Sequence, residues 1–176
     1  MPLSASSDHE QETSPVKIYE RREADSAWVQ AFLQEHWGGT KMIVHGEEID
    51  LLQAPALIAS PAQGLLTYRY LGRRIEILSI DALYGTKGVG TALLVALIQN
   101  ARLAKIEALD VTTTNDNLTA LRFYQRKGFK LSALRVAAVD KARLLKPSIP
   151  LVSDNGIPIR DELDLVLSLH MPLDEP

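Results

Sequence analysis

Three of the chain's 10 glycines, Gly85, Gly88 and Gly90, stand within six positions, directly before a run of alanines and leucines. A glycine loop between a strand and a strong helix presents free backbone N–H groups and the positive end of the helix dipole, which together bind phosphate groups. Glycine suits such a loop because a Cβ atom would hold the anion away. A tight strand-to-helix turn that only needs positive φ angles would use the same glycines. The glycines alone therefore leave both interpretations open.

Two phosphate-binding patterns do not fit this loop. A P-loop has the pattern Gly-x-x-x-x-Gly-Lys-Ser/Thr, but Thr91 follows Gly90 where the lysine should stand. A dinucleotide-binding loop has the pattern Gly-x-Gly-x-x-Gly, but Leu93 occupies the third glycine position. A protein that binds ATP or NAD through this loop stays an alternative, which protection of the fold by those ligands in a melting assay would reveal.

Glu76 is the first candidate for a proton acceptor. It lies among apolar residues of segment 73–83, which we predict to be the strand that leads into the glycine loop. Partial burial there would raise the pKa of its carboxyl toward the range useful for a general base. The alternative is a glutamate on a solvated strand face, or one paired with Arg73 or Arg74. Further candidates are Asp81, His45 and His170.

Asn117 and Tyr124 are seven positions apart in a segment with a helical pattern. At 100° per residue, two such side chains lie on nearly the same side of a helix, two turns from one another. One helix face can therefore touch one ligand with both residues. Taken without further context, Tyr124 is equally compatible with a core aromatic residue whose hydroxyl is satisfied within the protein.

The elements that position these residues follow from hydrophobic periodicity and turn residues. We predict helices at 24–37, 90–105, 115–128 and 140–147, with Asn115 or Asp116 as the cap of the third. Strands are predicted at 16–22, 41–52, 54–60, 64–71, 73–83, 106–114, 129–139 and 160–170, with the segments from 41 to 83 forming an antiparallel meander. The expected fold class is α/β (α+β), with a single mixed, mostly antiparallel central sheet of about six to seven strands and helices on both faces.

Composition narrows the classes of function. With 176 residues and 46% hydrophobic residues, the chain suffices for one domain, predicted at 15–176 after a flexible polar tail at 1–14. The absence of cysteine excludes disulfides, thiolate zinc sites and a cysteine nucleophile. A net charge of −3 gives no overall attraction to nucleic acid, and no segment approaches the roughly 20 apolar residues that span a bilayer. We expect a soluble cytoplasmic protein that binds neither nucleic acid nor membrane.

The glycine loop and the helix of Tyr124 together resemble the GNAT superfamily of acyl-CoA-dependent N-acyltransferases. The family's loop, Gln/Arg-x-x-Gly-x-Gly/Ala, corresponds to residues 85–90, and its second signature is Asn-x-x-Ala-x-x-x-Tyr followed by Gly-Phe. The second signature is matched by Asn117, Ala120, Tyr124, Gly128 and Phe129. The predicted element order extends the resemblance over roughly residues 16–170. Gly85 replaces the family's Gln or Arg, so we expect weakened or rearranged cofactor binding, supported by backbone donors and the charge of Lys87.

This resemblance implies an N-acetyltransferase that moves an acetyl group from acetyl-CoA to a primary amine by direct attack, without a metal. It places the pyrophosphate on the backbone amides of Thr86, Lys87, Gly88, Val89, Gly90 and Thr91. It places the pantetheine arm beside Leu78, Ser79 and Ile80, which can pair with the arm as they would with a strand. Asn117 would hydrogen-bond the arm, and Tyr124 would protonate the departing thiolate. Glu76 would be the base that provides the neutral amine.

The acceptor and the partners are not specified by these residues. We expect a small-molecule or peptide amine, and a homodimer is one open arrangement. The segment 146–162 is expected to shape the acceptor site, and Asp161 and Glu162 either attract a cationic amine or form an acidic pair without a partner. The alternative function is a non-catalytic acyl-CoA-binding sensor or interaction module of the same fold.

Overall fold

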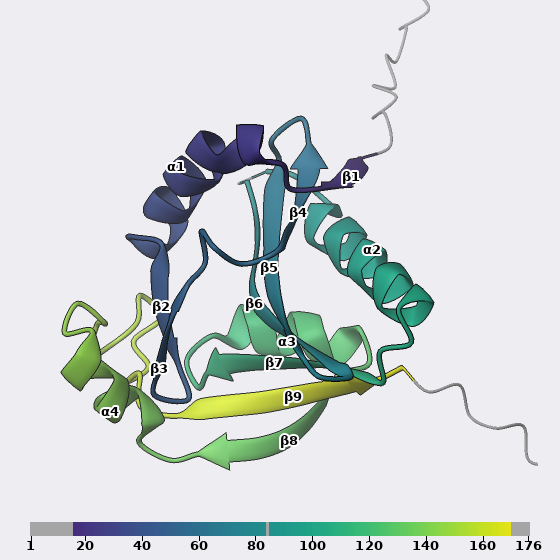
Figure 1. The fold of residues 1–176 in the computed structure, drawn as a ribbon. Coiled ribbons are helices and arrows are strands. Elements are labelled where there is room, and N and C mark those ends of the chain that lie inside the picture. The colour runs from purple at the N-terminus through teal and green to yellow at the C-terminus, as the bar shows by residue number, and fades with distance from the viewer. Residues whose placement is uncertain (1–15, 84, 170–176) are drawn as a thin grey trace, which may run out of the picture.

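The computed structural model describes residues 16–83 and 85–169 (Figure 1). The predicted tail at 1–14 and the candidate base His170 lie outside the described residues. Within the described part, no helix combines the length and apolar character that crossing a membrane requires.

The elements follow one another as a strand and a helix, a series of strands, and then alternating helices and strands. They are β1 (Lys17–Glu20), the 3-10 helix η1 (Glu23–Asp25), α1 (Ser26–Trp37), β2 (Lys41–Val44), β3 (Glu47–Asp50), β4 (Ala56–Ser60), β5 (Gly64–Leu71), β6 (Arg74–Ala82), α2 (Val89–Leu103), β7 (Ala108–Thr114), α3 (Leu118–Arg126), β8 (Lys130–Arg135), α4 (Ala138–Leu145) and β9 (Glu162–Ser168).

The main sheet has seven strands in the order β1-β4-β5-β6-β7-β9-β8. Every neighbouring pair is antiparallel except β6 and β7, which are parallel and joined through α2. This confirms the predicted mixed, mostly antiparallel sheet. The last strand of the chain, β9, lies between β7 and β8, so β8 forms this edge of the sheet. All six residues of β8 are exposed, which suits an edge strand, whereas Leu165 of β9 is buried.

Two local predictions were wrong because backbone turns redirect the chain. Segment 41–50 is not part of the meander: His45 and Gly46 both have positive φ, and they fold β2 and β3 into a separate two-stranded hairpin. The predicted strand at 129–139 ends at Arg135, and α4 begins at Ala138, because Ala137 has a φ of 58° and reverses the chain.

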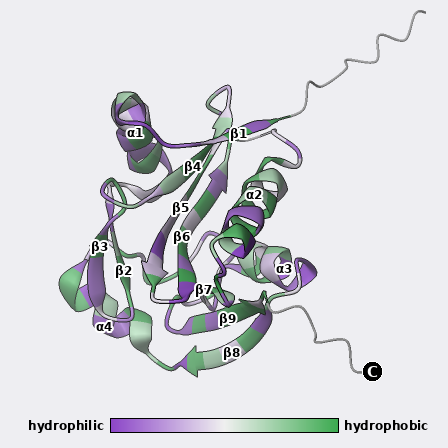
Figure 2. Cartoon of the chain, turned by 45° about the vertical axis from the view of Figure 1, so that its right-hand side comes forward, coloured by the Kyte–Doolittle hydropathy of each residue, from purple (hydrophilic) through white to green (hydrophobic). Residues whose placement is uncertain are grey.

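Hydrophobic residues cover both faces of the sheet, as predicted. On one face Leu93 and Leu97 of α2 and Tyr124 of α3 pack against the strands, and on the other Phe32 and Leu33 of α1 do so. Figures 1 and 2 show α1 and α2 on either side of β4, β5 and β6. The residues that could do chemistry must therefore lie at the ends of strands or where the sheet opens.

Candidate active site

The sheet opens between β6 and β7. The two strands pair only from Arg74 opposite Ala108 to Ile77 opposite Val111, although β6 continues to Ala82 and β7 to Thr114. A bulge marks the point of divergence: Tyr68 of β5 faces Ile77 and Thr67 faces Ser79, so Leu78 is the extra residue. Bulges bend a strand and commonly lie next to active sites. From Leu78 onward the edge of β6 that faces β7 is left unpaired.

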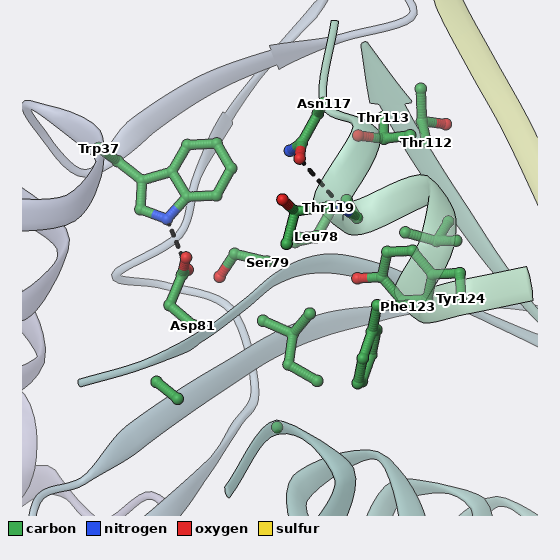
Figure 3. A pocket seen from close by; sticks show the side chains of 15 residues that line it. Trp37, Leu78, Ser79, Asp81, Thr112, Thr113, Asn117, Thr119, Phe123 and Tyr124 are labelled. Atoms are coloured by element: carbon green, nitrogen blue, oxygen red, sulfur yellow. Dashed lines mark hydrogen bonds between the residues drawn. The ribbon is translucent and has the colours of Figure 1, made fainter. Parts of the chain in front are cut away.

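A cavity of about 320 Å³ occupies this opening (Figure 3). Its walls come from the diverging strands, from α3, from the start of α2 and from the end of α1. They are Trp37, Leu78, Ser79, Ile80, Asp81, Ala82, Gly90, Val111, Thr112, Thr113, Asn117, Thr119, Ala120, Phe123 and Tyr124. The structure thus brings the predicted strand residues, the end of the glycine loop and both helix residues to one cavity.

The glycine loop combines the two interpretations that the sequence left open. Gly85 and Gly88 have φ angles of +83° and +78°, so the turn itself requires them. Gly90 is helical, and a Cβ there would meet only the Phe123 ring at 3.8 Å, so packing does not require glycine. Gly90 instead lines the cavity, where a bare backbone permits close approach of a ligand.

Helix α2 starts at Val89 with Gly88 as its N-cap. The N–H groups from Gly88 to Thr91 therefore have no carbonyl partner within the helix and lie at its positive end. Thr86 differs from the expectation, because its amide donates to the Leu83 carbonyl over 3.2 Å and helps to close the turn. Lys87 is exposed beside these amides. The donors available to an anion are the amides that follow Thr86.

Tyr124 lies on α3 with 3% of its surface exposed. The rings of Phe123 and Phe129 pack against its ring with centroid distances of 5.3 and 5.2 Å, and Figure 3 shows its hydroxyl turned toward the cavity. Burial raises the pKa of the phenol well above its ordinary value, and the negative charge of Asp81 adds to this shift. Tyr124 therefore stays protonated at any physiological pH and acts as a donor.

Asn117 is the N-cap of α3, in place of the predicted Asn115 or Asp116. Its Oδ1 accepts from the Ala120 amide over 3.0 Å, which fixes the side chain at the cavity wall. Asn115 has a different role that sequence reasoning missed. Its Oδ1 accepts from the amides of Arg160 and Asp161, which ties the segment before β9 to the start of α3.

Asp81 and Trp37 form a pair that the sequence did not indicate. The Trp37 Nε1–H donates to Asp81 Oδ2 over 2.7 Å, and both residues line the cavity (Figure 3). Burial raises the pKa of the Asp81 carboxyl, while the hydrogen bond from Trp37 limits the rise. A carboxylate with a raised pKa beside a cavity has the properties of a proton acceptor.

A second cavity, of about 520 Å³, adjoins the first on the α1 side of the opening. Residues of β2, α4 and the loop after α4 form much of its wall, and Glu162 of β9 lies in that wall. The residues that line both cavities are Trp37, Leu78, Thr112, Thr113 and Asn117. The two cavities therefore share part of their walls.

Glu76 lies outside the linings of both cavities. It is 3% exposed, and its Oε2 accepts from Arg69 Nε over 2.5 Å. The predicted alternative of an ion pair thus holds, but with Arg69 as the partner, because the β5–β6 register sets Arg69 directly opposite Glu76. Arg73 and Arg74 pair with Glu107 and Asp110 instead.

His45, another candidate base, also points elsewhere. Its Nε2 contacts Asp164 Oδ1 at 2.9 Å, and the hydroxyl of Thr112 donates to the same oxygen over 2.8 Å. Burial pushes the pKa of Asp164 up, but these hydrogen bonds outweigh burial and hold it below its ordinary value. This cluster joins the β2–β3 hairpin to the main sheet.

Comparison with known proteins identifies the family of the chain. The model of the Acetyltransferase (GNAT) family matches residues 6–129. The chain belongs to this family. The uncharacterized protein YxbD of Bacillus subtilis (strain 168) is 43% identical over 146 residues, which cover 81% of this chain and 92% of that protein.

Solved structures show the same fold at lower identity. A Bacillus subtilis acetyltransferase in complex with CoA has a TM-score of 0.63 and 18% identity, covering 87% of this chain and 98% of that one. The ribosomal-protein-S18-alanine N-acetyltransferase of Escherichia coli has a TM-score of 0.63 and 14% identity. The match covers 92% of this chain and 98% of that one. The arrangement of strands and helices described above is therefore that of GNAT acetyltransferases.

Proposed function

We propose that this GNAT protein transfers an acetyl group from acetyl-CoA to a primary amine by direct attack. One observation carries the proposal. The N-terminus of α2, the unpaired edge of β6 and Tyr124 all line the one cavity in the opening between β6 and β7. The CoA complex of the Bacillus subtilis acetyltransferase of the same fold supports the choice of cofactor.

The chain's own groups suit the parts of acetyl-CoA. The amides from Lys87 to Thr91 bind the diphosphate at the positive end of α2, and Lys87 adds a charge. The free edge of β6 at Leu78, Ser79 and Ile80 pairs with the amides of the pantetheine arm as a neighbouring strand would. Asn117 keeps its Nδ2–H groups available at the cavity wall, because its cap uses only Oδ1.

Acid–base chemistry is provided from the two sides of the opening. The amine attacks with its lone pair, so its proton must be removed, and Asp81 takes this proton. The nitrogen forms a bond to the carbonyl carbon, the carbon–sulfur bond breaks, and Tyr124 gives its proton to the thiolate. The proton that the nitrogen loses as the amide forms then restores the phenol of Tyr124. We assign the base to Asp81 in preference to Glu76, because Asp81 lines the cavity whereas Glu76 is held by Arg69 outside it.

Thiol release from acetyl-CoA tests this proposal. The purified protein is incubated with acetyl-CoA and a panel of primary amines, and free CoA and the acetylated amine are measured. Amine-dependent release in equal amounts of both products is expected. Tight binding of acetyl-CoA with no product from any amine would instead identify a sensor or interaction module of the GNAT fold.

A further inference from the structure

The second cavity is mostly apolar and lies where an acceptor would approach the thioester. Its apolar wall consists of Met42, Ile43, Val44, Val139, Ala142, Ile149 and Pro150. Two charged side chains also line it, Glu162 and Lys146. A volume of about 520 Å³ is within the usual range for a site that encloses a small molecule.

Glu162 carries a carboxylate oxygen without a partner in this wall. The residue is 4% exposed, and its Oε2 has no hydrogen-bond partner among the described residues. A buried carboxylate oxygen that accepts no hydrogen bond is costly, and native proteins rarely retain one without a purpose. The missing group is a donor, and a cationic donor offsets the cost best.

Two cations of the surrounding elements do not serve as that donor. Arg135 is opposite Glu162 in the β8–β9 register, but its Nε donates to Asp164 over 2.8 Å. Lys146 follows the far end of α4, where its Nζ donates to the Lys41 carbonyl over 2.9 Å. Each of these two cations is therefore bound to another group.

The neighbouring acid behaves differently, which separates the pair that the sequence could not resolve. Asp161 accepts from the Ala137 amide through Oδ1 over 2.7 Å and fixes the start of α4. It does not line the cavity. Asp161 is thus structural, while Glu162 lines the second cavity.

We propose that Glu162 binds the ammonium group of the acceptor, and that the acceptor is a primary amine on an apolar body. The inference rests on the proposed acetyl transfer and names the substrate class of that site. The apolar wall accommodates an alkyl or aryl-alkyl group, and the carboxylate selects a cation.

Burial raises the pKa of Glu162, the charge and the backbone N–H of His45 oppose this rise, and the smaller effects of Asp164 and Arg135 raise and lower the pKa respectively. An arriving ammonium favours the ionised carboxylate and therefore the charged pair. Before it can attack the thioester carbonyl, the ammonium group must then pass a proton to the proposed base Asp81 on β6.

The test compares Glu162→Gln with wild type, using 2-phenylethylamine as the acceptor. Loss of a charge-assisted hydrogen bond should raise the KM for the amine roughly 10- to 100-fold. The KM for acetyl-CoA should stay unchanged. Glu35→Gln, which alters an exposed carboxylate on α1, is the matched control and should leave both values as they are. An unchanged KM for the amine in Glu162→Gln would overturn the inference.

A binding measurement keeps the inference testable without turnover. With CoA present, 2-phenylethylamine should raise the Tm of the wild type more than the isosteric alcohol 2-phenylethanol does. Glu162→Gln should lose this preference while keeping the wild-type response to CoA. Equal shifts by amine and alcohol in the wild type would overturn the role of Glu162. Failure of acetyl transfer alongside a preserved preference would count against the proposed function only.

Discussion

Tyr124 and Asp81 are two ionisable side chains that line the first cavity, and burial raises the pKa of both. For a phenol the shift keeps the proton on, and for a carboxyl it makes the group a stronger proton acceptor. The same physical cause thus keeps the phenol of Tyr124 protonated and makes Asp81 the stronger proton acceptor, which is the protonation that their proposed roles require.

Tyr124→Phe should lower kcat by about 100-fold or more, the usual scale for loss of a general acid. The ring stays in place between Phe123 and Phe129, so the Tm and the affinity for acetyl-CoA should change little. Steady-state kinetics and calorimetric binding of acetyl-CoA measure the two quantities. An unchanged kcat would remove Tyr124 as the acid.

Asp81 should set the acidic limb of the pH–rate profile, because the base acts only when deprotonated and the rate falls below its pKa. The hydrogen bond from Trp37 lowers that pKa. Trp37→Phe should therefore raise it and move the limb to higher pH. Asp81→Asn should reduce the rate and abolish the limb. A limb at the wild-type position in both variants would show that another group is the base.

Sequence spacing predicted the helix residues of the cavity but not the Trp37–Asp81 pair. Asn117 and Tyr124 lie in one continuous motif, so helix periodicity alone places them together. Trp37 and Asp81 are 44 positions apart and meet only after α1 packs on the sheet. Glu76 shows the converse: apolar neighbours predicted its burial, while the strand register determined that Arg69 would neutralise it.

At the scale of elements, the start of α2 contributes to the wall of the first cavity, and the loop after α4 contributes to the wall of the second. The turn that leads into α2 depends on the positive φ angles of Gly85 and Gly88. The loop after α4 depends on Arg143, whose guanidinium donates to the carbonyls of Ile149 and Ile159 over 3.1 and 2.5 Å and pairs with Asp140. In each element, one substitution should therefore alter ligand binding in a way that can be distinguished from a general loss of stability.

Gly90→Ala should leave the protein equally stable or up to about 1 kcal/mol more stable, because alanine is the better helix residue. Acetyl-CoA should nevertheless bind about tenfold more weakly, since a Cβ would stand between the helix amides and the diphosphate. Gly72→Ala is the reverse control. Its φ of +62° predicts a loss of about 1 kcal/mol with unchanged affinity. Wild-type affinity in Gly90→Ala would place the diphosphate elsewhere.

Arg143→Ala should loosen the loop that closes the second cavity. The KM for the amine should rise several-fold while the KM for acetyl-CoA stays the same, because the first cavity does not contact this loop. Arg102→Ala, at an exposed site near the end of α2, is the control for loss of an arginine. Equal effects on both KM values would indicate general destabilisation and contradict the separation of the two cavities.

At the scale of the whole molecule, the two adjoining cavities lie where the sheet opens between β6 and β7. The order of elements, the meander from β4 to β6 and the crossover through α2 were predictable, because they follow from local periodicity and turn residues. The position of β9 and the β2–β3 hairpin were not, because strand order is decided by packing between distant segments. Both of these less predictable parts contribute to the second cavity, which is lined by β2 of the hairpin and by Glu162 of β9.

A crystal structure with CoA is the most direct measurement of the central claim. The diphosphate should contact the amides between Lys87 and Thr91, and the sulfur should lie in the opening between β6 and β7 beside the hydroxyl of Tyr124. A diphosphate bound away from the start of α2, or a sulfur that does not enter the opening, would contradict the account.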